Sequence, residues 1–302
     1  QTMKSKMINQ NISNDKKLMK IFKILLYPII VASASSCIEN AEIAVECDPC
    51  TSPLSYDGYT SIFSDEFNST TLSENWNYIE GDGCPDECGW GVSEELEFYT
   101  TENIELREGN MIITAKKENK GQSQYTSGNI NTLDKFSFTY GRVDIRAKLP
   151  KGQGIWPSFY LLGDNINEAK WPIPGHISVS EMKGGDGKGG DNSIVGKLIW
   201  GTPTKVESAT EIATLKDGIL NDKFHVFSVI WEPTRIQWLL NDKVYFEQKT
   251  DAGMNGTFNK LFHLNMKLAV GGNFPGNPDG NTVFPQQMYV DYVRVFQKEL
   301  AP

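Results

Sequence analysis

The sequence predicts an all-β fold, a sandwich of two antiparallel sheets, and three features of the chain support this prediction. Apolar and polar residues alternate along several runs of four to eight residues, as in strands that are buried on one face. Clusters of Gly, Asn, Asp and Pro separate these runs. No long stretch keeps the helical period, and no internal repeat is visible. Many short strands between residues 59 and 298 indicate one two-sheet domain.

The clearest strand predictions lie beyond residue 140. The alternating runs are Arg142–Leu149, Phe224–Trp231, Arg235–Leu240 and Tyr289–Phe296. Asn241-Asp-Lys follows the third run and fits a hairpin turn, because Asn and Asp tolerate left-handed backbone. Other large side chains in regular strands are interpreted as packed in the core: Trp200, Trp231, Trp238, His225 and His263.

The composition fits one large domain and excludes some classes of partner. In 302 residues, 39% are hydrophobic and 11% aromatic, which is enough for a sizeable core. The formal net charge of −9 would repel nucleic acid and anionic membranes at long range. A neutral polysaccharide is compatible with this charge, and nothing in the sequence indicates an obligate oligomer.

Residues 1–37 have the order of an export signal. Basic residues precede an apolar run, Ile24 to Ala34, and small residues then lead to Cys37. This run is too short to span a bilayer. Cleavage before Cys37 would give a lipoprotein anchored at the cell surface or in the periplasm, and ordinary secretion is the alternative. Residues 38–58 are predicted to be a tether between membrane and domain.

The remaining four cysteines are expected to form disulfides, since their number is even and the chain is predicted to be exported. Cys84 and Cys88 would pin a loop. Cys47 and Cys50 have the spacing of a redox pair, but no βαβ pattern surrounds them, so a local disulfide is favoured.

Five ordered segments connect the chain to a known family. They are Phe63–Asn68, Gly81–Gly91, Gly152–Gly163, Ala269–Gly276 and Met288–Phe296. Together they resemble glycoside hydrolase family 16, in its laminarinase-like branch of endo-β-1,3-glucanases. The resemblance implies a jelly roll whose concave sheet holds a glycan-binding cleft.

The resemblance also locates an active strand with altered chemistry. Family members read Gly-Glu-Ile-Asp-Ile-Met-Glu where this chain reads Gly175-His-Ile-Ser-Val-Ser-Glu181. His176 thus stands at the nucleophile position, Ser178 at the helper position and Glu181 at the acid/base position. Residues two apart share a strand face, and a bulge would bring Glu181 to that face. A protonated His176 is expected to lower the pKa of Glu181 and to pair with it.

Retaining glycosidases need two carboxylates roughly 5–5.5 Å apart, and this strand keeps one. An inverting mechanism would need a second carboxylate farther away. Four acids lie in segments that could approach the cleft, but they are interpreted as solvated loop charges: Glu94, Glu95, Glu97 and Asp186.

Further site residues are implied by the resemblance. Those expected to bind glycan are Trp90, Asn129, Trp156, Tyr160, Trp171, Lys197, Lys267 and Phe274. The two lysines would recognise a sulfated or uronic glycan, or would neutralise Glu181, which is favoured. Glu66, Gly109 and Asp291 match a structural calcium site, with ordinary solvated acids as the alternative. No cofactor is expected for catalysis.

These features predict a monomeric, surface-associated protein that binds β-glucan on a family 16 scaffold and is catalytically impaired. One alternative is an active endo-β-glucanase with Glu181 as acid/base. A structural β-sandwich without glycan binding is the other.

Overall fold

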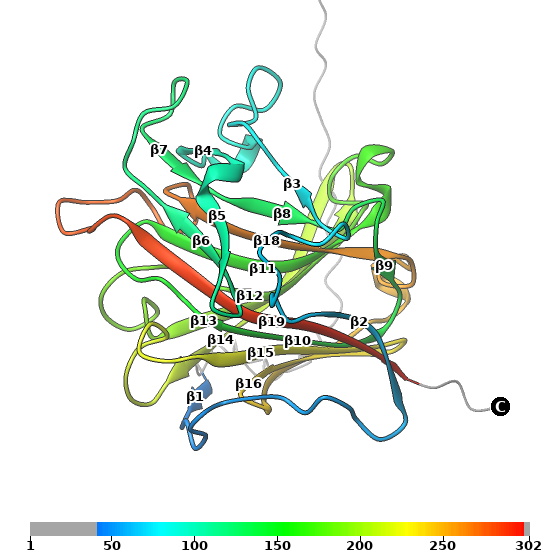
Figure 1. Cartoon of the computed structure of the whole chain (residues 1–302). Helices are drawn as coiled ribbons and strands as arrows, with labels where there is room; N and C mark the ends of the chain where they lie inside the picture. Colours follow the sequence, from blue (N-terminus) through cyan, green and yellow to red (C-terminus); the bar gives the residue numbers. More distant parts are fainter. Residues whose placement is uncertain (1–40, 299–302) are drawn as a thin grey trace, which may run out of the picture. The chain divides into compact units, whose positions relative to one another are not determined.

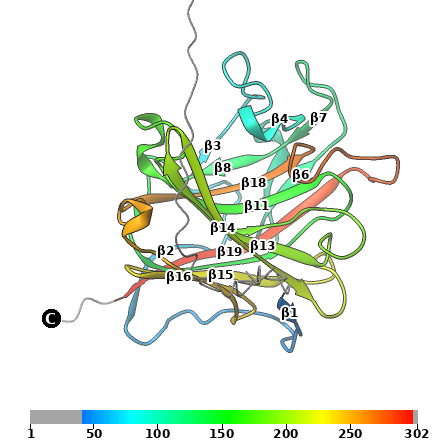
Figure 2. The same cartoon turned by 180° about the vertical axis from the view of Figure 1, so that it is seen from behind.

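Two sheets packed face to face form most of the structure, a computed structural model that describes residues 41–298 (Figure 1, Figure 2). The predictions for residues 1–40, including cleavage at Cys37, lie outside the described residues. No α-helix occurs in the described part, which has only short 3-10 turns besides its strands. No helix within residues 41–298 is long and apolar enough to cross a membrane.

The first sheet has nine strands, and β12 lies near its middle. Its order is β1 (Ala41–Ile43), β14 (Lys205–Leu215), β13 (Ser193–Thr202), β12 (His176–Glu181), β11 (Ile155–Gly163), β18 (Phe262–Val270), β8 (Asn129–Asn131) and β3 (Asn77–Tyr78), with β9 (Ser137–Phe138) also paired to β18. All pairs in this sheet are antiparallel except β1 with β14.

The second sheet has eight strands. Its order is β17 (Lys243–Lys249), β16 (Arg235–Leu240), β15 (His225–Glu232), β10 (Gly141–Lys148), β19 (Gln286–Lys298), β6 (Asn110–Ala115) and β5 (Ile104–Arg107), with β2 (Tyr59–Asp65) also paired to β19. A separate parallel pair joins β4 (Glu97–Tyr99) to β7 (Tyr125–Ser127). The 3-10 turns are η1 (Gly91–Ser93), η2 (Thr101–Asn103), η3 (Asp164–Asn167) and η4 (Ala252–Met254).

The predicted all-β sandwich is confirmed, and so are the four strands expected beyond residue 140: Arg235–Leu240 has the predicted ends, and the ends of the other three are shifted by one to three residues. The turn after β16 also forms as expected. Asn241 and Asp242 have φ of 50° and 64°, the left-handed backbone that a tight two-residue hairpin needs.

The core lies between the sheets and holds the back of β12 in place. Ile177 and Val179 of β12 are buried in it with Phe227 of β15. Trp238 of β16 is fully buried, and its indole N–H donates to the backbone carbonyl of Ser178 at 2.6 Å. A side chain of the second sheet thus fixes the strand on which the altered active residues lie.

The other residues assigned to the core behave as the pattern predicts. Trp231, His225 and His263 are each 1% exposed, and Trp200 is half-buried against the core. Burial lowers the pKa of both His225 and His263, so they are neutral packed side chains at pH 7.

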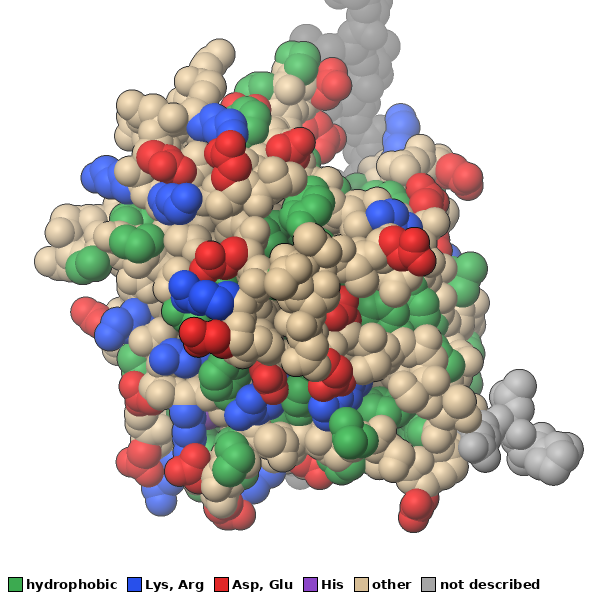
Figure 3. Space-filling view, in the orientation of Figure 1, with side chains coloured by type: hydrophobic (Ala, Val, Ile, Leu, Met, Phe, Trp, Pro, Cys, Tyr) green, Lys and Arg blue, Asp and Glu red, His purple; other side chains and the backbone are tan. Residues whose placement is uncertain are grey.

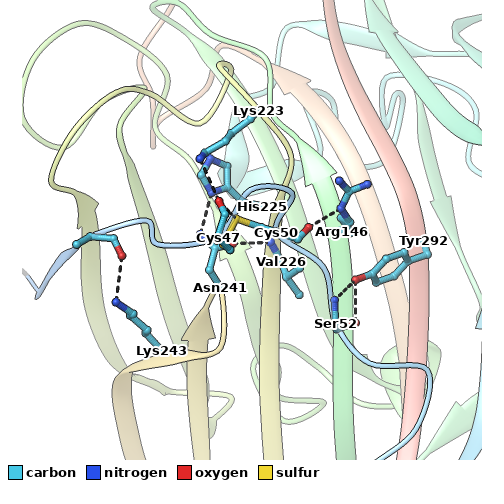
Figure 4. The surroundings of a disulfide bond; sticks show 11 residues. Cys47, Cys50, Ser52, Arg146, Lys223, His225, Val226, Asn241, Lys243 and Tyr292 are labelled. Atoms are coloured by element: carbon cyan, nitrogen blue, oxygen red, sulfur yellow. Dashed lines mark hydrogen bonds between the residues drawn. A yellow bond between two sulfur atoms is a disulfide. The ribbon is translucent and has the colours of Figure 1, made fainter.

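Residues 41–58 are packed on the domain, so the predicted tether over residues 38–58 is wrong for its described part. β1 pairs with the end of β14, and a disulfide joins Cys47 to Cys50. Arg146 donates to the carbonyl of Cys50, and the hydroxyl of Tyr292 accepts from the backbone N–H of Ser52, both at 2.6 Å (Figure 4). The sequence of this segment shows no apolar periodicity, because hydrogen bonds from side chains of the second sheet to its backbone, and not an apolar face of its own, hold it on the domain.

The surface carries mixed charge. Acidic and basic side chains are interspersed over the face seen in Figure 3. Both disulfides favoured by the sequence are present, since Cys84 is also joined to Cys88.

Replacing Trp238 with Phe tests the link between core and active strand. We expect Trp238→Phe to lower the free energy of unfolding by about 2 kcal/mol, because the Ser178 carbonyl loses a buried donor and the core loses volume. Urea denaturation measures this change. Phe246→Leu is the control, since Phe246 stacks on Trp238 at 4.5 Å without that bond and should cost less. Equal costs would contradict a special role for the hydrogen bond.

Candidate functional site

A bulge in β12 brings His176, Ser178 and Glu181 to one face of the sheet. Ser178 pairs with Lys197 of β13 and Tyr160 of β11, whereas Glu181 pairs with Val195 and Ser158. Three steps along β12 therefore match two on each neighbour, as in a β-bulge. Val179 is buried in the core at the bulge. The bulge that the sequence spacing predicts is confirmed.

This face forms the floor of a cleft of about 530 Å³. Strands of the first sheet and the loops at their ends supply the walls. The lining residues are Val92, Ser93, Trp156, Ser158, Tyr160, Leu162, Ile166, Trp171, His176, Glu181, Lys197, Ile199, Val206, Lys267, Asn273 and Phe274. Six of the eight residues expected to bind glycan are among them.

The other two, Trp90 and Asn129, are not among the residues that line the cleft, and their role in glycan binding stays a prediction. Trp90 has left-handed backbone at the start of η1, and its ring packs on Tyr99 with centroids 5.6 Å apart. Val92 and Ser93 take the rim instead. Asn129 lies on β8, one strand beyond the lining residue Lys267, and is 8% exposed.

Aromatic rings form much of the cleft wall. Tyr160 stacks on His176, with centroids 4.8 Å apart and planes 14° apart. Trp171 meets the same imidazole edge-on at 6.3 Å and is 40% exposed. Across the cleft, Trp156 packs on Phe274 at 5.2 Å. These rings offer flat apolar faces beside polar groups, an arrangement suited to the C–H faces of sugars.

Glu181 is a buried carboxylate that stays ionised. One oxygen accepts from the indole N–H of Trp156 at 3.3 Å, and the other lies 3.6 Å from Nε2 of His176. The second separation is longer than a hydrogen bond, so this contact is electrostatic. Burial alone would raise the pKa of Glu181, but His176 and then Lys197 outweigh it and lower the pKa to about 2.

A second cluster of charged side chains, Glu95, Glu97 and Lys267, lies beside the cleft. Two predictions about these residues are wrong: that the two acids are solvated, and that Lys267 neutralises Glu181. Glu95 and Glu97 are 4% and 0% exposed, so they are not solvated loop charges. Lys267 donates to Glu95, not to Glu181, and Tyr99 donates to the other Glu95 oxygen at 2.7 Å. Glu94 and Asp186 are exposed, as expected, and neither lines the cleft.

The pKa values of the two buried acids, Glu95 and Glu97, are shifted in opposite directions. Burial would raise the pKa of Glu95, but the Lys267 ammonium holds it below its usual range. Burial and the adjacent Glu95 charge raise the pKa of Glu97 well above its usual range. The spacing of Glu95, Glu97 and Tyr99 by two residues was the available signal, because it places them on one face of a strand.

The residues of the predicted calcium site have other partners. Both oxygens of Glu66 accept from Arg294 at 2.7 Å, and Asp291 pairs with Arg146 at 2.7 Å. Within residues 41–298, no group of three or more His, Cys, Asp and Glu side chains is arranged to hold a metal ion. The site, including Gly109, stays a prediction.

Two family models match the chain. The model described as glycosyl hydrolases family 16 matches residues 93–294. The model described as beta-glucan synthesis-associated protein SKN1/KRE6/Sbg1 matches residues 5–171.

Curated relatives include both enzymes and binding proteins by name. The chain is 34% identical to a beta-glucanase of Rhodothermus marinus over 78% of this chain and 84% of that protein. It is also 34% identical to the clotting factor G alpha subunit of Tachypleus tridentatus over 78% of its length, but spans only 34% of that relative. A beta-1,3-glucan-binding protein of Penaeus monodon is 28% identical over 51% of this chain and 49% of that protein.

Solved structures share the fold. The catalytic domain of an endo-1,3-beta-glucanase (laminarinase) from Thermotoga petrophila matches with a TM-score of 0.74 and 35% identity. The match covers 80% of this chain and 99% of that domain.

The low pKa of Glu181 predicts a defined pH dependence of stability. Its charge stabilises the fold above pH 4.5, and this contribution is lost as the pH falls from 4.5 to about 2. Such a shift corresponds to about 3 kcal/mol. Glu181→Gln should lack this component in urea denaturation between pH 2 and 6, whereas Glu94→Gln, at an exposed acid, should keep it. The same pH dependence in Glu181→Gln and wild type would refute the assignment.

Proposed function

Because the chain belongs to glycosyl hydrolase family 16, we propose that its cleft binds a β-glucan such as laminarin and that hydrolysis by the retaining mechanism is impaired. The cleft of about 530 Å³ and its aromatic walls support binding. Impaired hydrolysis is proposed because β12 has one carboxylate, Glu181, where the family motif has a nucleophile and an acid/base.

The observation that carries the proposal is the pairing of His176 with Glu181 at 3.6 Å. An imidazole occupies the place where a retaining enzyme has its nucleophilic carboxylate. The remaining carboxylate has a pKa of about 2 and is ionised at neutral pH, so it cannot protonate a leaving group efficiently. Loss of the nucleophile alone costs on the order of 10⁴- to 10⁶-fold in rate for other covalent catalysts.

An active endo-β-glucanase is the second candidate, favoured by the retained Glu181 and by the enzyme names among the relatives. It would need another carboxylate near the sugar. Among the described residues that line the cleft, Glu181 is the single acid. Glu97 accepts from the backbone N–H of Val270 at 2.6 Å and does not line the cleft. The binding function is therefore preferred over this candidate.

A structural sandwich without a ligand is the third candidate. The buried polar atoms at the cleft floor argue against it. The Ser158 hydroxyl has no hydrogen-bond partner among the described residues, and Nε2 of His176 has only its 3.6 Å contact with Glu181. Such atoms cost free energy unless water or a ligand satisfies them.

We also propose that the protein is exported and anchored by a lipid on Cys37, with simple secretion as the alternative. The packing of residues 41–58 bears on this proposal. From Cys37 to Ala41 the chain can reach at most about 14 Å. A lipid on Cys37 would therefore hold the domain close to the bilayer surface and not lift it away.

Calorimetric titration with laminarin oligosaccharides, followed by product analysis of the same sample, tests the function. We expect binding with the sugar left intact, and about tenfold weaker binding by Trp171→Ala, since an exposed ring that faces the cleft is removed. Tyr78→Ala is the control, because Tyr78 is 41% exposed on β3 and outside the cleft. Cleaved sugar would establish the enzyme, and no binding would leave the structural role.

Restoring the family residues tests why hydrolysis is impaired. The double change His176→Glu with Ser178→Asp should raise release of reducing sugar from laminarin at least about 100-fold, because it supplies a nucleophile and a like charge that raises the pKa of Glu181. Ser178→Asp alone is the control and should give no gain. A double variant that binds laminarin but remains inactive would place the defect elsewhere in the cleft.

A further inference from the structure

We propose that the cleft recognises an anionic group on its glycan, a sulfate ester or a carboxylate, through Lys197. This inference rests on the proposed glycan-binding function and specifies the chemical class of the ligand. It concerns the floor of the same cleft, between the His176–Tyr160 stack and Phe274.

Lys197 is the cation of the cleft that lacks a counterion. It lines the cleft from β13 and is half-buried. Its ammonium lies 6.0 Å from the centroid of the Phe274 ring. No hydrogen bond and no carboxylate within 4.0 Å involves it among the described residues. A half-buried ammonium has three N–H donors to satisfy, and here the protein supplies no acceptor.

The other charges of the cleft are already paired. Lys267 donates to Glu95 and lies over the Trp156 ring at 5.0 Å. Glu181 accepts from the Trp156 indole and faces His176. Glu181 attracts Lys197 at longer range, which lowers the pKa of Glu181, but no direct ion pair forms. Lys197 is thus left to interact with a ligand.

Buried hydroxyl groups at the cleft floor also bear on which ligand the cleft can accept. Ser178 pairs with Lys197 across the strands and is 0% exposed, and Ser158 lines the cleft and is 2% exposed. The Ser158 hydroxyl lacks a partner among the described residues, whereas the Ser178 hydroxyl and the His176 ring lie beside Glu181 and lower its pKa. The cleft floor therefore offers the Lys197 ammonium and the Ser158 hydroxyl to a ligand, whereas its carboxylate, Glu181, already has neighbours.

A ligand that complements this floor must be rich in acceptors. A sulfate ester presents three oxygens that share a negative charge and a uronate carboxylate presents two, whereas a sugar hydroxyl is a neutral acceptor. Hydrogen bonds to charged acceptors are also about twice as strong as neutral ones. The net charge of −9 repels a polyanion at long range. A preference for the anionic glycan should therefore come from its local contact with Lys197, and this preference should weaken as the salt concentration rises.

The test compares three laminarin oligosaccharides of one length: unmodified, sulfated, and oxidised to the uronate at C6. Calorimetry with the purified protein should show about tenfold tighter binding of at least one anionic form, and the two forms identify which group is recognised. Lys197→Met should bring the ratio of anionic to neutral affinity close to one, and Lys197→Arg should retain it. Lys249→Met, at an exposed lysine of β17, is the control and should change neither affinity nor ratio.

The outcomes separate this inference from the proposed function. Equal affinity for all three sugars in wild type would overturn the inference and leave glucan binding intact. A preference that survives in Lys197→Met, or that inorganic sulfate does not compete, would also overturn it. Binding of an anionic form alone would support it and replace the neutral glucan as ligand. Binding of none of the sugars would overturn both.

Discussion

The bulge in β12 is the constraint on which the site depends. It lets Glu181 share a face with His176 and Ser178 although the spacing from Ser178 is three residues. The bulge is supported on its back by buried Val179 and by the indole of Trp238, which bonds the Ser178 carbonyl from the opposite sheet. Both supports are core features, so substitutions on the cleft face can change its chemistry and leave its geometry in place.

Basic side chains stabilise the buried carboxylates at and beside the cleft floor. Each buried carboxylate named here has a basic side chain beside it: His176 lies 3.6 Å from Glu181, and Lys267 donates to Glu95. A buried carboxylate that is paired and hydrogen-bonded can remain ionised at low cost, but it loses the raised pKa that a general acid needs. The contacts that keep Glu181 and Glu95 ionised thus oppose their protonation.

The fold was more predictable from the sequence than the site. Alternation and turn residues determine strands such as β10, β15 and β16 locally, because one face of each is buried. The pairing of Lys267 with Glu95 was not predictable, since it joins segments more than 170 residues apart and depends on which buried acid the lysine reaches. Residues 41–58 were mistaken for a linker because their hydrogen bonds come from distant side chains, which leave no periodic pattern.

The parallel pairing of β1 with β14 has a consequence for self-association. β14 would otherwise end the first sheet with its last residues unpaired, and an open strand edge is a template for pairing with another copy of the chain. β1 covers Ala213 to Leu215, and charged side chains at Lys205, Glu207 and Glu211 occupy the uncovered part. Proteolysis before Cys47 would therefore leave the cleft intact but expose a fresh edge, turning the trimmed protein into one prone to aggregate.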